Sequence, residues 1–149
     1  MKLWSFIAIL LLCTGCGKDD NTTNSLFEGE YFGTYGRAYL STNNTDEWFK
    51  FYSNPTWNSC SATIKIIKVA ENQLQFQCIS AMRTFDGVYS FIISDDGKIS
   101  CETTDGYTTI SIENGKFSYF YNAHWWNNGI QPGTGSGYVD RVSIQAYKK

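Results

Sequence analysis

The chain has 149 residues, of which 42% are hydrophobic, 17% aromatic and 17% charged, with a formal net charge of −2. This length suits one domain, and the composition excludes both an intrinsically disordered chain and a bundle of membrane helices. The low charge, without a basic stripe, also argues against nucleic acid as a partner.

Residues 1–15 have the pattern of an export signal. Lys2 supplies a positive start, and residues 3–12 are almost wholly apolar. Ten residues span only about 15 Å as a helix, about half of a bilayer core, so the segment is typical of a cleaved signal rather than a membrane span.

The stretch Cys13-Thr14-Gly15-Cys16 resembles a lipobox, the cleavage and lipidation motif of bacterial lipoproteins. The resemblance implies cleavage after residue 15 and lipidation of Cys16, whose acyl chains would anchor the mature protein to a membrane. The alternative is a plain secretory signal with cysteines present by chance.

The next residues, Gly17-Lys18-Asp19-Asp20, resemble the surface-export signal of Bacteroidetes-type lipoproteins. This resemblance implies a position in the cell outer membrane, facing outward. Residues 16–26 are therefore expected to be the lipidated Cys16 and a flexible polar tether. An ordinary solvated linker is the alternative.

Residues 27–149 are predicted to form one β-domain. Strand patterns cover residues 27–40, 48–52, 62–69, 74–80, 84–94, 98–102, 107–113, 116–124 and 137–147. No window shows a convincing apolar stripe of helical period. Turn signals such as Asp95-Asp96-Gly97 and Asn114-Gly115 separate neighbouring strands, and such short links force antiparallel pairing.

The expected fold is all-β, an antiparallel up-and-down meander of eight or nine strands that closes into a barrel. Closure would hide the edge strands. Eight strands enclose just enough room for side chains or one small ligand. A sandwich of two β-sheets is the alternative layout.

The pattern resembles a lipocalin-like (calycin) barrel. Lipocalins open their first strand with Gly-x-Trp, and Gly29-Glu30-Tyr31 stands at that place. They also bring an Arg from the last strand across that ring, and Arg141 is placed to do this. The resemblance implies that Tyr31 and Arg141 close one end by cation–π packing, and that the other end is an open mouth.

Candidate ligand-binding residues gather at the end of the strand that covers residues 116–124. They are His124, Trp125, Trp126, Asn127 and Asn128, with Trp57 from a second loop. Tryptophan faces stack on the apolar face of a sugar, and Asn and His hydrogen-bond its hydroxyls. The alternative is that the tryptophans only cap the end of the barrel.

The sequence contains no recognisable set of catalytic residues. One His with Asp140 and many serines is not a triad, and the mature chain has no Cys-x-x-Cys, His-x-His or calcium-loop spacing. We therefore expect no enzyme, cofactor or metal. Cys60, Cys78 and Cys101 fit either one disulfide with a spare thiol or buried free thiols.

The sequence thus predicts a cell-envelope lipoprotein whose lipocalin-like domain binds a small apolar or sugar-like ligand. The alternative is a structural or protein-interaction subunit of an outer-membrane complex. That alternative predicts a filled barrel and an exposed apolar patch.

Overall fold

The computed structural model describes residues 27–127 and 135–149, so the predicted signal, lipidation site and tether lie outside it. The described elements, in chain order, are β1 (Gly29–Thr42), α2 (Thr45–Ser53), β2 (Asn58–Ala70), β3 (Gln73–Ser80), β4 (Thr84–Ile93), β5 (Ile99–Cys101), β6 (Thr108–Glu113), β7 (Lys116–Asn127) and β8 (Ser136–Lys148). None of the helical structure in these ranges has the length and apolar character needed to cross a membrane.

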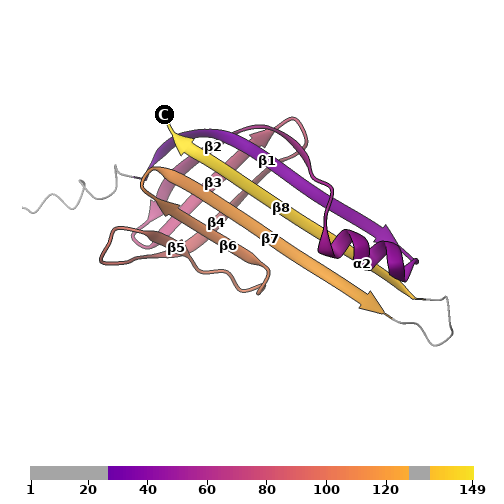
Figure 1. The fold of residues 1–149 in the computed structure, drawn as a ribbon. Helices are drawn as coiled ribbons and strands as arrows, with labels where there is room; N and C mark the ends of the chain where they lie inside the picture. The colour runs from indigo at the N-terminus through magenta and orange to yellow at the C-terminus, as the bar shows by residue number, and fades with distance from the viewer. Residues whose placement is uncertain (1–26, 128–134) are drawn as a thin grey trace, which may run out of the picture.

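The eight described strands form a closed antiparallel barrel (Figure 1). Each strand pairs with the next in the chain, and β1 pairs with β8 to complete the ring. This confirms the predicted up-and-down meander and its closure, and the sandwich alternative is wrong. The topology is that of a lipocalin-like barrel.

Residues 48–52, predicted as a strand, lie instead in the helix α2. The Asn44 side chain caps the helix by accepting hydrogen bonds from the backbone N–H groups of Asp46 and Glu47, at 3.0 and 3.1 Å. The negative charges of Asp46 and Glu47, in the first turn, also stabilise the helix by interacting with the positive end of its dipole. Trp48 is the buried residue of α2, and Phe51 and Tyr52, one turn further along the helix, are half-buried.

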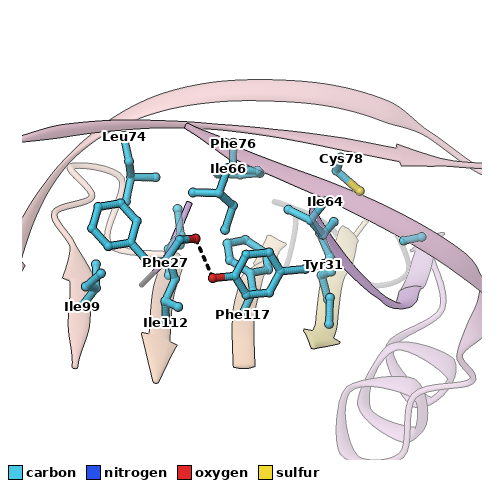
Figure 2. Packing of buried hydrophobic residues seen from close by; sticks show 14 of the residues in the cluster. Phe27, Tyr31, Ile64, Ile66, Leu74, Phe76, Cys78, Ile99, Ile112 and Phe117 are labelled. Carbon is cyan, nitrogen blue, oxygen red and sulfur yellow. Dashed lines mark hydrogen bonds between the residues drawn. The ribbon is translucent and has the colours of Figure 1, made fainter. Parts of the chain in front are cut away.

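The middle of the barrel is filled by its own side chains (Figure 2). Phe76 is fully buried, and its ring centre lies 5.3–5.7 Å from the ring centres of Phe85, Tyr89, Phe117 and Tyr119. These rings come from three different strands and meet mostly edge-on or tilted, the arrangements that aromatic pairs favour.

Phe27 and Tyr31 close the end of the barrel at which the described chain begins. Phe27 is 2% exposed, and the Tyr31 hydroxyl donates a 2.6 Å hydrogen bond to its carbonyl oxygen (Figure 2). The turn between β6 and β7 lies at this end. Its residues Asn114 and Gly115 both have positive φ, 50° and 72°, as the sequence signal predicts.

At the opposite end, three strands continue beyond the others. β1 pairs with β2 only as far as Arg37, but with β8 as far as Thr42. β7 pairs with β6 only as far as Tyr121, but with β8 as far as Asn127. Residues 38–42, 122–127 and 136–141 therefore form a three-stranded extension of the barrel wall, and α2 lies across the ends of β1 and β8 (Figure 1).

Candidate ligand site at the open end

The inner face of the three-stranded extension carries exposed rings around an ion pair. Strand alternation continues from the core into this face, so Arg37 and Tyr39 follow buried Tyr35 along β1, while Tyr138 and Asp140 precede buried Val142 along β8. Trp125 lies opposite Tyr138. We call Arg37, Tyr39, Trp125, Tyr138 and Asp140 the open-end platform. Its three rings are 38–54% exposed.

The ion pair of the platform has bidentate geometry. Arg37 donates from Nε and Nη2 to the two carboxylate oxygens of Asp140, each at 2.8 Å. The Arg37 guanidinium also lies 4.9 Å from the ring centre of Tyr39. Asp140 raises the pKa of Arg37, chiefly through the side-chain hydrogen bond. The pair therefore cancels its own charge and orients the Tyr39 ring.

A hydroxyl group lies buried beneath the platform. Tyr35 is 1% exposed, and among the described residues its hydroxyl is the buried side-chain polar atom without a hydrogen-bond partner. Burial raises the pKa of Tyr35, while the charges of Arg37 and Arg83 act in the lowering direction. Tyr35 is therefore a neutral phenol at neutral pH, and its hydroxyl has an unused capacity to donate and accept hydrogen bonds.

The outer face of the extension holds α2. Trp48 donates its indole N–H to the backbone oxygen of Tyr138 at 3.3 Å, and its ring lies 5.7 Å from that of Trp126. The Tyr52 ring stacks on the Trp48 ring, with 5.0 Å between the ring centres, and its centre lies 4.9 Å from that of the His124 ring. His124 and Trp126, both predicted ligand-binding residues, therefore pack against the helix.

The other predicted ligand-binding residues do not meet at one site. Trp125 belongs to the platform, on the face opposite Trp126, because neighbouring residues of a strand point in opposite directions. Asn127 is exposed at the end of β7, and Asn128 lies outside the described residues. Trp57, 40% exposed, lies 3.4 Å from where a Cβ atom on Gly36 would stand.

Tyr31 and Arg141 also lie apart. Arg141 pairs with Ala38, seven residues along β1 from Tyr31, or about 23 Å in a strand. The Arg141 guanidinium lies 4.9 Å from the ring centre of Tyr52 in α2. Arg141 thus has Tyr52 as its aromatic partner, and Phe27 packs at the end that contains Tyr31.

Sequence reasoning named one member of the platform, Trp125, as a binding residue and missed the others. The available signal was the alternation of β1 and β8: Tyr39 follows Tyr31 and Tyr35, and Tyr138 precedes Val142 on the same face. What the sequence lacks is the register that sets these strands side by side.

The three cysteines of the described domain, Cys60, Cys78 and Cys101, are free thiols. Burial raises the pKa of Cys78 to about 11 and that of Cys101 to about 12. These two thiols are therefore protonated at neutral pH and poor nucleophiles. The described residues also contain no group of three His, Cys, Asp or Glu side chains arranged to hold a metal ion.

A separate hollow of about 260 Å³ lies at the closed end. Phe27, Ile93, Ile99 and Ile112 supply its apolar lining, and residues of the two neighbouring turns complete it. It is the rival location for an apolar ligand, because the ring-filled middle of the barrel separates it from the platform.

No family model and no curated protein matches this chain. Among solved structures, it is similar to Ex-FABP, described as a siderocalin that functions through dual ligand specificities. The two share 8% sequence identity with a TM-score of 0.38, over 82% of this chain and 73% of that one. The strand register of this chain itself defines the fold.

Proposed function

We propose that this protein is a binding protein that holds a small ligand with a flat apolar or sugar-like ring on the open-end platform. The observation that carries the proposal is the grouping of Tyr39, Trp125 and Tyr138, exposed on one face, above the unpartnered hydroxyl of Tyr35. Aromatic faces supply stacking area, and the hydroxyl supplies direction.

The filled interior determines where such a ligand would bind. Because Phe76 and its neighbours occupy the middle of the barrel, the proposal places the ligand above this core. A ring lying on Trp125 and Tyr138 would bring its oxygen atoms toward Arg37 and Tyr35. Arg37 is already paired with Asp140, so the site favours a neutral polar group over a strongly charged one.

The test compares variants of two platform rings with a control variant at an exposed tyrosine outside the platform. A glycan array and a set of flat apolar compounds are screened against the mature protein, with tryptophan fluorescence as the readout. Trp125→Ala and Tyr138→Ala should each weaken binding by roughly tenfold, since a stacked ring contributes about 1–1.5 kcal/mol. Tyr147→Ala, at a more exposed position of β8, should bind as the wild type does.

A second variant separates the platform from the closed-end hollow. Ile93 is exposed and lines that hollow, so Ile93→Trp should fill it without disturbing the core. Binding that survives Ile93→Trp and is lost in Trp125→Ala supports the platform. The reverse pattern would place the ligand at the closed end and refute the proposal.

We also propose that the mature chain is a lipoprotein of the cell outer membrane, anchored through Cys16 and facing outward. The support is the signal pattern of residues 1–15, the lipobox-like motif and the charges that follow it. Cells fed an alkyne-bearing palmitate analogue should label the wild type but not Cys16→Ser. External protease should remove the domain from intact cells, and protection of the domain would exclude the outward orientation.

A protein-interaction subunit is the second candidate function. The observation in its favour is the filled barrel together with exposed apolar side chains on the outer wall, among them Val88, Ile92 and Tyr147, each more than half exposed. Mild crosslinking in cells followed by purification should then recover a defined envelope partner in fixed proportion. Recovery of the monomer alone would exclude it.

A further inference from the structure

The strand pairing of the barrel wall is incomplete between β4 and β6. β5 has three residues and pairs only with residues 91–93 of β4 and 110–112 of β6. Residues 84–89 of β4 therefore pair with β3 on one side and, among the described residues, with no strand on the other. The chain that follows β5, residues 102–105, lies across this opening.

Alternate residues of β4 direct their backbone groups into the opening. The N–H of Phe91 donates toward the β3 side, whereas the backbone oxygen of Ser90 accepts from Glu102 on the β5 side at 2.8 Å. Successive residues of a strand direct these groups to opposite edges. The N–H and C=O groups of Asp86 and Val88 therefore point to the unpaired edge, which is a template for another strand.

The groove along this edge is acidic. It measures about 290 Å³ and is lined by residues 88–90 and 102–105, including the carboxylates of Glu102 and Asp105. Hydrogen bonds from the Thr108 hydroxyl and from backbone N–H groups lower the pKa of Asp105, so this group is charged at neutral pH. Asp86 adds a third carboxylate on the exposed face of β4.

We propose that a partner polypeptide adds an extended segment bearing Lys or Arg to the free edge of β4, between residues 84–89 and 102–105. The six free residues offer about 20 Å of edge. Backbone bonds to Asp86 and Val88 align the segment, and its basic side chains meet Glu102 and Asp105. This surface is separate from the open-end platform, so its failure leaves the ligand proposal standing.

The test uses a labelled ten-residue peptide of alternating Lys and Val, titrated into the mature protein by fluorescence anisotropy, with an alternating Glu–Val peptide as control. Val88→Pro removes an edge N–H and blocks approach, while the bonds to β3 come from the neighbouring residues. It should weaken binding of the Lys–Val peptide by roughly tenfold or more. Val88→Thr, which keeps the N–H, should retain binding.

Two further measurements keep the test independent of the folding of the proline variant. Two further Lys–Val peptides carry a methyl group on alternate backbone nitrogens, one on those of the Lys residues and the other on those of the Val residues. Only one of the two should bind, because only one keeps the N–H groups that face β4. Hydrogen exchange at the Val88 amide should slow when the unmodified peptide is added.

Three results would overturn the proposal: no binding of the Lys–Val peptide, equal binding of the Glu–Val peptide, or equal binding by Val88→Pro. A dimer of the protein alone that disappears in Val88→Pro would also overturn it, because the edge would then pair with a second copy of this chain.

Discussion

Within the open-end platform, Arg37 of β1 donates two hydrogen bonds of 2.8 Å to the carboxylate of Asp140, its diagonal neighbour on β8. The side chains are 38% and 18% exposed, so water screens the pair only in part. Arg37 lies in turn against the ring of Tyr39. The pair therefore links the two strands whose contact closes the barrel.

Asp140→Ala is expected to lower the free energy of unfolding by about 1–2 kcal/mol, because a half-buried guanidinium loses both charged acceptors while solvent offsets part of the loss. Urea denaturation measures the change. Glu113→Ala, which removes an exposed pair with Lys98 at 3.9 Å, should cost less than about 0.5 kcal/mol. Equal effects would show that the platform pair is no stronger than a surface pair.

Phe76→Ala is expected to cost about 3–5 kcal/mol, because it removes a ring that contacts four others and leaves a cavity that they fill poorly. Phe120→Ala changes the same side chain at a position 40% exposed on β7, and should cost less than about 1 kcal/mol. Chemical denaturation of both variants provides the comparison. A small effect at Phe76 would mean that the core is loosely packed.

Gly33 and Gly36 of β1 should respond differently to alanine. A Cβ atom on Gly33 would collide with backbone atoms of Gln145 and Ala146 in β8, which cannot move without opening the β1–β8 ladder. One on Gly36 would lie 3.4 Å from the Trp57 ring, an ordinary contact. Thermal unfolding should show Gly33→Ala as severely destabilised or unfolded and Gly36→Ala as near wild type, and comparable melting temperatures would contradict the β1–β8 packing.

Trp48→Ala is expected to release α2 from the outer face of the extension at a cost of about 3 kcal/mol, since Trp48 is the buried anchor of that helix. Limited proteolysis should then cut within residues 43–57. Phe49→Ala, at an adjacent and exposed position, should leave the cleavage pattern unchanged. If the Trp48 variant resists the protease, contacts other than those of Trp48 hold α2 in place.

The domain should lose stability as the pH rises above about 9. In the folded state Cys78 keeps its proton to a pKa of about 11 and Cys101 to about 12, whereas in the unfolded chain both lose it near 9. The folded state then binds more protons, so the free energy of unfolding falls through this window, by up to about 1.4 kcal/mol per unit of pKa difference. Urea titrations at pH 8, 9.5 and 10.5 measure the slope.

The double variant Cys78→Ala with Cys101→Ala serves as the control for this pH dependence. It should be less stable at pH 8 but show a flatter decline between pH 8 and 9.5. At higher pH the raised pKa of buried Tyr31 adds its own decline in both proteins. An unchanged slope would mean that the thiols do not carry the effect.

The barrel itself was predictable because its signals are local. Apolar and polar residues alternate along β3 and β8, and Asn114-Gly115 supplies the positive φ angles of a tight turn. Short links then leave antiparallel pairing as the only option. A meander follows from these facts without knowledge of any long-range contact.

The segment around Trp48 shows where local signals conflict. Asn44, Asp46 and Glu47 form a helix start, while the aromatic residues that follow favour a strand. In the helix, Trp48 packs against Trp126 and donates a hydrogen bond to the backbone oxygen of Tyr138. Its partners lie more than 70 residues away in the chain, so the sequence pattern does not contain them.

By itself, the sequence determined the strand class, the order of the strands and most of the turns. The tertiary structure decided which face each functional residue occupies at the open end. Trp125 and Trp126 are neighbours in the chain, yet one belongs to the platform and the other packs against α2. Their separation depends on β7 continuing as a strand to Asn127, and it does so because β8 supplies a pairing partner along the whole extension. Backbone hydrogen bonding between distant segments, rather than local preference, sets that length.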